Sequence, residues 1–337
     1  MITISDEQKT LALGFLGVGW IGRNRMEMIL KHSSANADVI VEPSPENAAE
    51  ALKSAQSAKL EESYAAMVQK DDLDGIVIAT PSAMHAEQSI EALRAGKAVF
   101  CQKPLGRTAA EVKEVVKASA EADKSLAVDL SYRHVKAFQE IHRLITNKEI
   151  GDIYAVDLVF HNAYGPDKDW FYDITRSGGG CVMDLGIHLV DLALWCLEFP
   201  EIKEVKSQLY LKGKKLEQLE GQVEDYASVS LTSEKDTIVN MQCSWHVSAG
   251  QDAVIEARFY GTDGGAAVKN MNGSFYDFTA EKYNGTQKEV LVSPPDEWGG
   301  RAGVAWAEKL LEGSGHDPET ANELVKTAEI IDRIYGR

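Results

Sequence analysis

Three polar residues, Asp184, His188 and Asp191, interrupt the apolar segment GGGCVMDLGIHLVDLALW at residues 178–195. A helix over residues 178–197 would place them on one face, because residues three and four apart are neighbours on a helix. A histidine beside a carboxylate is suited to proton transfer near neutral pH. The segment therefore predicts either a site that handles a proton or a stripe that faces water.

The apolar residues of this helix predict how it is buried. One set of side chains is expected to pack against a sheet, namely Val182, Leu185, Leu189 and Leu192. The opposite stripe would then consist of Cys181, Asp184, His188, Asp191 and Trp195. This pattern is compatible with both alternatives, including one in which the aspartate only tethers the histidine.

A second candidate site is the segment GVGWIG, from Gly17 to Gly22, which follows an apolar strand and opens a helix. Its G-x-G-x-x-G spacing is typical of a dinucleotide-binding turn, where the helix N-terminus offers free N–H groups to a pyrophosphate. Glu42 lies 20 residues after Gly22, at the end of the next predicted strand, where a carboxylate can bind ribose hydroxyls. A carboxylate there repels a 2′-phosphate, so we expect NAD rather than NADP.

Residues 1–131 alternate apolar strands with amphipathic helices, which indicates a parallel sheet covered on both faces. A dinucleotide lies across the carboxyl ends of such strands. The loops ATPSAMH and CQKPL leave those ends, and Lys103 is expected in the crevice rather than in solvent. The expected cofactor-binding residues are Gly17, Gly19, Trp20, Ile21, Gly22, Glu42, Ala79, Thr80, Pro81, His85, Gln102 and Lys103.

After Tyr132 the pattern changes to longer alternating strands, which are IYAVDLVFHNAYG, EVKSQLYLKG, DYASVSLTS, TIVNMQCSWHV, AVIEARFYGTDG and KEVLVS. They predict an open, mainly antiparallel sheet with the helix at 178–197 on one face. The expected fold is α/β, with a Rossmann-type doubly wound domain at 1–131 and an α+β domain for substrate binding and oligomerisation at 132–337. We expect the exposed sheet face to pair with another copy, giving a homodimer or homotetramer.

Charge and composition narrow the class of protein. The 337 residues contain 35 Lys and Arg against 52 Asp and Glu, a net charge of −17. This charge repels phosphate backbones and anionic lipid, so neither nucleic acid nor membrane is an expected partner. The N-terminus lacks a secretory pattern, and we expect a cytoplasmic protein. The four cysteines form no C-x-x-C pair and have no histidine at ligand spacing, so no metal is expected.

The two candidate sites become more informative together. A dinucleotide domain needs a second domain that brings a substrate to the nicotinamide. Oxidation of an alcohol removes a hydroxyl proton, which a histidine can accept, while a lysine ammonium stabilises the developing alkoxide. The combination of the glycine-rich turn with Lys103, Asp184 and His188 therefore favours the proton-handling site.

Three motifs resemble those of the Gfo/Idh/MocA family of sugar and inositol oxidoreductases. They are GFLGVGWIG, CQKPL at the position of the family's Glu-Lys-Pro, and GGGCVMDLGIHLVDL at its Gly-Gly-x₄-Asp-x₃-His helix, and FYGTDGG is similar to a later strand and turn. The resemblance implies that Lys103 binds the reacting hydroxyl and touches the nicotinamide. It also implies that His188 is the general acid/base, that Asp184 orients His188 and contacts substrate, and that Asp191 and His161 contact substrate.

Aromatic side chains are candidate walls of a sugar pocket, because aromatic faces suit the C–H-rich faces of sugars. Tyr164, Trp170 and Trp245 are the candidates, although a core or interface role is equally compatible with each. The expected substrate-binding residues are Lys103, His161, Tyr164, Asp184, His188, Asp191 and Trp245. Gln102 departs from the family pattern, which usually has Glu, so Lys103 loses a neighbouring negative charge.

The residues favour an NAD-dependent dehydrogenase or ketone reductase, and the resemblance implies that it acts on a secondary hydroxyl of a sugar, sugar derivative or cyclitol. The resemblance implies two alternatives: an enzyme that recycles bound NAD while it eliminates a glycosidic or similar leaving group, and a non-catalytic sensor of NAD and sugar. The presence of Lys103, Asp184 and His188 argues against the sensor. The pocket depends on the register of the later strands, so the particular sugar does not follow from the sequence.

Overall fold

A six-stranded parallel sheet forms the N-terminal half of the computed structural model, which describes residues 9–217, 219 and 221–337. Its order, β3-β2-β1-β4-β5-β6, confirms the doubly wound prediction. The strands are β1 (Leu11–Leu16), β2 (Ala35–Val41), β3 (Lys59–Leu60), β4 (Gly75–Ile78), β5 (Ala98–Cys101) and β6 (Leu126–Val128). Residues 1–8, the first part of the segment in which no secretory pattern was found, lie outside the described residues.

Helices cover both faces of this sheet, as the apolar strands require. They are α1 (Trp20–His32), α2 (Pro45–Ser54), α3 (Tyr64–Val68), α4 (Ser82–Arg94) and α5 (Ala109–Ala122). Ser44 and Thr108 cap α2 and α5 through their side-chain oxygens, as expected of these residues. The short elements β3 and α3 were not predicted, because two strand residues and one helical turn carry too little periodicity.

A nine-stranded sheet forms most of the second half, in the order β15-β14-β13-β12-β7-β11-β10-β8-β9. Every pairing is antiparallel except that of β7 with β11, which confirms the mainly antiparallel prediction. The strands are β7 (Ile153–Asn162), β8 (Ile202–Leu211), β9 (Lys214–Leu216), β10 (Tyr226–Ser233), β11 (Ile238–Ser244), β12 (Ala253–Gly261), β13 (Gly264–Asn270), β14 (Phe278–Asn284) and β15 (Gln287–Val292). The analysis of the sequence did not anticipate β9, β13 and β14.

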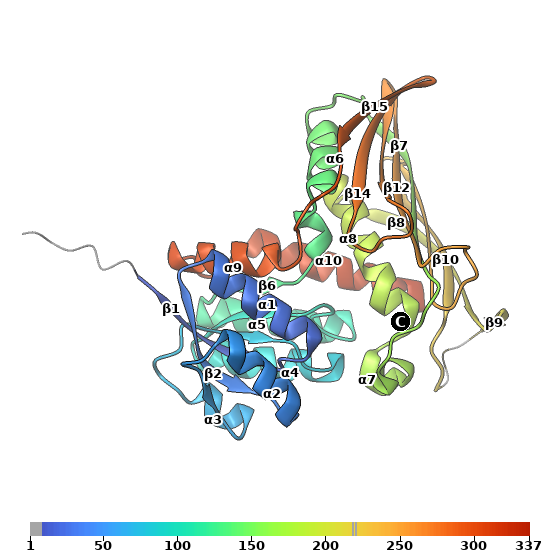
Figure 1. The fold of residues 1–337 in the computed structure, drawn as a ribbon. Coiled ribbons are helices and arrows are strands. Elements are labelled where there is room, and N and C mark those ends of the chain that lie inside the picture. The colour runs from blue at the N-terminus through green and yellow to red at the C-terminus, as the bar shows by residue number, and fades with distance from the viewer. Residues whose placement is uncertain (1–8, 218, 220) are drawn as a thin grey trace, which may run out of the picture.

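The helices of the second half pack on one face of this sheet or against the first domain (Figure 1). They are η1 (Ser131–His134), α6 (Lys136–Thr146), η2 (Asp169–Tyr172), α7 (Ile174–Ser177), η3 (Val182–Gly186), α8 (Ile187–Cys196), α9 (Arg301–Leu311) and α10 (Pro318–Tyr335). Helix α10 contacts α5 of the first domain as well as α8 and β8. Helix α9 packs on α1 and β5, so the end of the chain returns to the Rossmann sheet.

The segment 178–197 is not one regular α-helix, which corrects the expected division of its faces. Residues 182–186 form a π-helical turn, which is wider than an α-helical turn, and α8 follows. Cys181 is fully buried against the Cys243 sulfur, and Asp191 is only 2% exposed. The prediction that this stripe faces water is therefore wrong. Helix α8 contacts β7 on one side and α6 and α10 on others.

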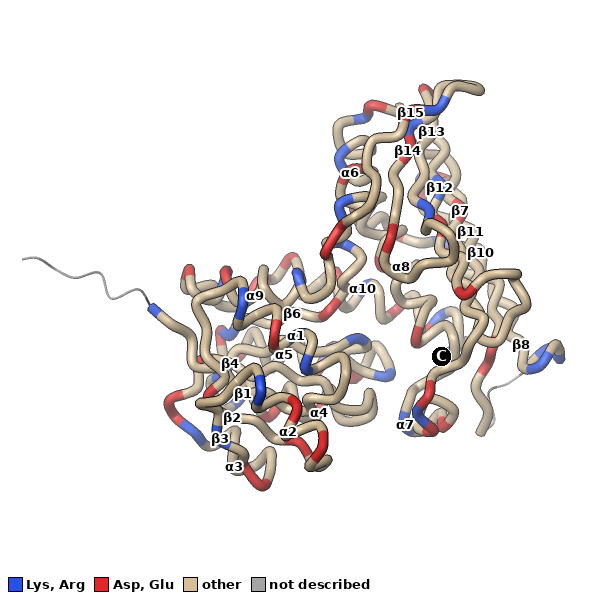
Figure 2. Tube along the Cα trace, viewed as in Figure 1, with Lys and Arg blue, Asp and Glu red and all other residues tan. Residues whose placement is uncertain are grey.

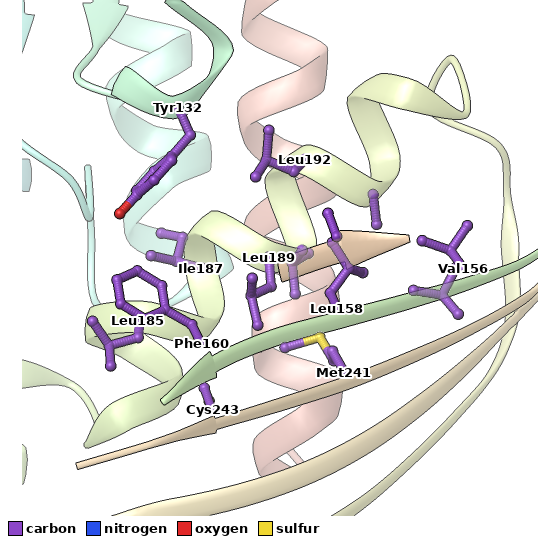
Figure 3. Close-up of a cluster of buried hydrophobic side chains, with 14 of the residues drawn as sticks. Tyr132, Val156, Leu158, Phe160, Leu185, Ile187, Leu189, Leu192, Met241 and Cys243 are labelled. Carbon is purple, nitrogen blue, oxygen red and sulfur yellow. The ribbon is translucent and has the colours of Figure 1, made fainter. Parts of the chain in front are cut away.

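The face of the large sheet toward α8 carries the core of the second domain (Figure 3). Leu158, Phe160 and Met241 alternate along β7 and β11 and meet Leu185 and Leu189 of the helical segment. The other face is open and mostly polar, and it is lined by residues that include Asp157, Lys206, Gln208, Ser228, Ser230, Asn240 and Gln242. The two faces thus differ strongly in polarity.

Charged side chains are interspersed over both domains, with basic residues lying among acidic ones (Figure 2). Among the described residues, one helical stretch, Ile174–Cys196, is long and apolar enough to cross a membrane. However, 89% of its apolar window is buried inside the protein, as is usual for a core helix.

Trp306 of α9 provides a test of how the C-terminal helices stabilise the first domain. Its ring centroid lies 5.8 Å from that of Phe100, and a Cβ at Gly75 would come within 2.9 Å of it. We predict that Trp306→Ala lowers the free energy of unfolding by about 3–5 kcal/mol, since it removes a buried aromatic ring. Trp20→Ala, at a position 67% exposed, should change it by less than about 0.5 kcal/mol in the same denaturant titration. Equal stability of the two variants would contradict this account.

Candidate active site

The glycine-rich turn between β1 and α1 has the shape that a pyrophosphate requires. A Cβ at Gly17, where φ is +80°, would lie 2.7 Å from the Ala79 carbonyl, and one at Gly22 would lie 2.1 Å from the Gly17 carbonyl. A Cβ at Gly19 would find only the Asn47 amide, at 4.0 Å. Gly17 and Gly22 thus permit close packing, while Gly19 leaves room beside a helix N-terminus that has no side-chain cap.

Glu42 lies against this turn from the end of β2. Its carboxylate accepts hydrogen bonds from the backbone N–H of Val18 at 2.7 Å and from that of Ser44 at 3.0 Å. The carboxylate is therefore held beside the expected position of a ribose. Trp20 is exposed and Ile21 is partly buried at the same turn, where their backbone N–H groups begin α1. These residues fit the cofactor-binding role expected of them.

His85 holds together the two loops that follow β4 and β5. Its Nδ1 lies 2.7 Å from the Pro104 carbonyl and its Nε2 lies 2.6 Å from the Thr80 carbonyl. The ring is 1% exposed, and its burial lowers the pKa of His85 despite the opposing effect of both carbonyls. His85 thus lies between the loop after β4 and the loop after β5, next to Pro81, the N-cap residue of α4.

Lys103 reaches across from the first domain to the helical segment of the second. Its ammonium donates to the backbone carbonyl and to the carboxylate Oδ1 of Asp184, both at 2.7 Å. Asp184 Oδ2 accepts a further hydrogen bond from the indole N–H of Trp245 at 3.1 Å. The side chains of Lys103 and Asp184 are 19% and 16% exposed, so the pair is shielded but remains accessible.

His188 is held by packing rather than by Asp184. Among the described residues, the Asp184 carboxylate bonds to Lys103 and Trp245, whereas the His188 ring packs edge-on against Tyr132 at 4.9 Å. Burial, followed by the positive charges of Lys103 and Arg25, lowers the pKa of His188 well below its usual value. The imidazole is therefore neutral at pH 7 and able to accept a proton.

A buried carboxylate fixes the start of the segment that carries Asp184. Glu224 accepts hydrogen bonds from the backbone N–H groups of Gly180 and Val182 and from the Tyr335 hydroxyl. A Cβ at Gly180 would lie 1.9 Å from the Glu224 carbonyl, and one at Gly179 would lie 2.0 Å from the Tyr335 hydroxyl. This crowding explains the run of glycines. No local pattern around Glu224 marked it for this role.

Three residues expected near the substrate have side-chain partners outside the group of Lys103, Asp184 and His188. Asp191 makes a bidentate ion pair with Arg133, whose other nitrogen binds Glu323 at 2.6 Å. His161 contacts Ser244 at 2.7 Å and stacks on Tyr226, on the open face of the large sheet. Tyr164 is exposed and donates to Asp252 at 2.6 Å. Among the described residues, none of the three hydrogen-bonds to Lys103, Asp184 or His188, and their contact with substrate stays a prediction.

The structure adds an aromatic wall beside Asp184. Phe171 and Tyr172 pack edge-on against Trp245, and the Tyr172 hydroxyl lies 3.4 Å from Nε2 of His246. Trp170 stacks on Phe171 at 3.8 Å, one layer farther from Asp184. Of the predicted pocket residues, Trp245 therefore contacts the site directly. Phe171, Tyr172 and His246 were missed, because loop residues carry no periodic signal.

Gln102 is part of a buried network that the sequence did not reveal. Its amide donates to the Asp129 carboxylate at 2.5 Å, and the same oxygen accepts from Arg25 Nε at 2.6 Å. All three residues are less than 9% exposed. A negative charge therefore does lie beside Gln102, but Asp129 at the end of β6 provides it.

This network predicts that the usual glutamate is not tolerated in this chain. Gln102→Glu would set two buried carboxylates against each other and should lower the free energy of unfolding by about 3 kcal/mol at pH 7. The loss should shrink as the pH falls, because a proton shared by the pair removes the repulsion. The double variant Gln102→Glu/Asp129→Asn keeps one negative charge beside Arg25 and should recover most of the loss in urea unfolding. Failure of the double variant to recover would show that charge is not the cause.

Comparisons with known proteins agree with this geometry. Residues 11–130 match the oxidoreductase family with an NAD-binding Rossmann fold, and residues 138–267 match the GFO/IDH/MocA C-terminal domain. The inositol 2-dehydrogenase of Rhizobium meliloti (strain 1021) is 29% identical over 266 residues, or 78% of this chain and 76% of the relative.

Solved structures share the whole fold. KijD10, a 3-ketoreductase from Actinomadura kijaniata in complex with NADP and TDP-benzene, has a TM-score of 0.83 at 19% identity, over 97% of this chain and 98% of that one. Levoglucosan dehydrogenase in complex with NADH and L-sorbose has a TM-score of 0.80 at 20% identity, over 97% of both chains. From the two family matches, which together span most of the sequence, we conclude that this chain belongs to the Gfo/Idh/MocA family of NAD(P)-binding oxidoreductases.

Proposed function

We propose that this protein is an NAD-dependent dehydrogenase that oxidises a secondary hydroxyl of a sugar, sugar derivative or cyclitol, and reduces the ketone in reverse. The observation that carries the proposal is the Lys103–Asp184 pair, which lies with the neutral His188 where the cofactor crevice meets the second domain. Relatives named inositol 2-dehydrogenase and levoglucosan dehydrogenase support this substrate class.

Lys103 and His188 have separate roles in the proposed reaction. When bound by the glycine-rich turn and Glu42, NAD supplies the acceptor for the hydride. The Lys103 ammonium uses two of its three N–H groups on Asp184, which leaves one for the substrate oxygen. That N–H positions the hydroxyl and stabilises negative charge on its oxygen. His188 accepts the hydroxyl proton during oxidation and returns it during reduction.

The pocket walls and the cofactor choice follow from neighbouring residues. Trp245, fixed by its bond to Asp184, and Tyr172 offer aromatic surface to a sugar ring. Glu42 favours NAD, because its carboxylate would repel a 2′-phosphate at the same place. The solved relatives include one complex with NADH and one with NADP. The expected preference for NAD over NADP therefore rests on Glu42 of this chain and not on its relatives.

Two organisational features belong to the same proposal. We assign residues 1–131 to cofactor binding and residues 132–337 to substrate binding and oligomerisation, with α9 packed back on the first domain. The open face of the large sheet is the surface through which a homodimer or homotetramer would form. Its polar lining, including Asp157, Asn240 and Gln242, implies an interface rich in hydrogen bonds rather than an apolar one.

The activity itself is the first test. With NAD and a panel of aldoses, uronates, inositols and glycosides, we expect NADH formation that falls by about 10²–10⁴-fold in His188→Ala and strongly in Lys103→Ala. The matched control is His161→Ala, which removes the same side chain from the open sheet face and should stay within a few-fold of wild type. Parallel assays with NADP measure the cofactor preference. Equal losses in His188→Ala and His161→Ala would refute the assigned roles.

The two alternatives predict different outcomes in the same assays. An eliminating enzyme would retain NAD through purification and convert glycosides without net NADH, again dependent on His188. A sensor would bind NAD and sugar with no turnover of any kind. The buried, neutral His188 beside Lys103 favours an enzyme, because a sensor has no need of a proton acceptor.

The pH dependence of oxidation gives an independent test of His188. A lowered pKa means that the proton-accepting form persists below pH 6.5, so activity should be lost only as the pH falls through the lowered value. We therefore expect the acidic limb of log kcat/KM to lie clearly below pH 6.5. Circular dichroism over the same range confirms that the enzyme stays folded. A limb at or above pH 6.5 would contradict a buried His188 as the base.

A further inference from the structure

Tyr132 has features that the assigned chemistry does not use. It lies in η1, where the chain passes from the first domain to the second, and it is 7% exposed. Its ring is enclosed by five others at centroid distances of 4.9–6.0 Å, those of Phe138, Phe160, His188, Phe278 and Trp298. Such packing fixes the direction of the hydroxyl within narrow limits.

Within the described part of the chain, the hydroxyl of Tyr132 makes no hydrogen bond, and its oxygen is not among the fully buried side-chain atoms that lack a partner. The oxygen is therefore open to solvent or to a ligand, although the residue as a whole is only 7% exposed. Figure 3 shows the oxygen at the edge of the apolar cluster rather than inside it. Phenylalanine would make the same ring contacts, so the packing alone gives no reason for a hydroxyl here.

Tyr132 lies beside the groups assigned to catalysis. The ring contacts His188 edge-on at 4.9 Å, and the pKa of Tyr132 is raised first by burial and then by the negative charge of Asp184. The phenol therefore stays protonated and can donate a hydrogen bond. Tyr132 lies on the His188 side of the site, while Trp245 lies on the Asp184 side.

We propose that Tyr132 determines substrate specificity by donating a hydrogen bond to the sugar hydroxyl next to the one that reacts. This inference rests on the proposed function. The reacting oxygen already has Lys103 and His188, whereas the neighbouring hydroxyl of a sugar or cyclitol ring needs its own partner. A donor fixed by packing beside His188 meets that need and pays little entropy on binding.

Tyr132→Phe isolates the hydroxyl, because it keeps the ring and its contacts. On the best substrate of the panel, kcat/KM should fall by about tenfold to a hundredfold, since a substrate hydroxyl is left unpaired. The melting temperature should be unchanged or higher. The matched control, Tyr154→Phe, removes a hydroxyl from a residue 58% exposed on β7 and should change neither quantity.

A substrate analogue that lacks the neighbouring hydroxyl allows two enzymes to be compared on two substrates, as in a double-mutant cycle. The kcat/KM of the wild type should fall on this analogue by about as much as the kcat/KM of Tyr132→Phe falls on the parent substrate. The kcat/KM of Tyr132→Phe should fall little further when the analogue replaces the parent. Independent, additive losses would overturn the proposal, as would full activity of Tyr132→Phe on the parent or a clear drop in its melting temperature. Calorimetric binding of the same compounds to the NADH-loaded enzyme gives a second readout. A wild type that neither binds nor converts any compound would reject the proposed function itself, and the role of Tyr132 with it.

Discussion

The contact between Lys103 and Asp184 is the interaction on which the arrangement of the site depends. It joins a loop at the end of β5 to the π-helical turn of the second domain, through two hydrogen bonds of 2.7 Å from one ammonium. Because one of these goes to the Asp184 backbone, the lysine also fixes the helical segment itself. Lys103 thus both assembles the interdomain site and retains one N–H for chemistry.

Several buried groups hold the two ends of this contact in place. On the first domain, the buried His85 ring lies between the Thr80 and Pro104 carbonyls and donates its single N–H to one of them, which steadies the loop that carries Lys103. On the second, Glu224 binds the backbone N–H groups that precede Asp184. Each support replaces water by a hydrogen bond to a buried partner, which is how an active site becomes rigid before substrate arrives.

The electrostatics of the site follow from the same burial. Lys103 and Arg25 lie near His188, and together with desolvation they keep its imidazole neutral. Arg25 is in turn paired with Asp129, which also accepts from Gln102. The departure of Gln102 from the family pattern is therefore matched by an acidic residue 27 positions later in the sequence, and the two positions have to be considered as one unit.

The sequence by itself predicted the features that depend on local periodicity and on motifs. The glycine-rich turn, the doubly wound order and the mainly antiparallel second sheet follow from spacing and strand composition. Each of these patterns is contained in a short segment of the sequence. The grouping of Lys103 with Asp184 likewise followed from motifs that the structure brings to one crevice.

Tertiary structure decided what depends on contacts between distant residues. Helical periodicity alone allowed one stripe of the segment 178–197 to face water. The π-helical turn and the packing of β7, α6 and α10 around α8 bury that stripe. The alternation of β7 set His161 on the open face, and Asp191 forms an ion pair with Arg133 that no local pattern indicates. Asp129 and Glu224 acquire their roles only from partners 27 or more residues away, which no local pattern encodes.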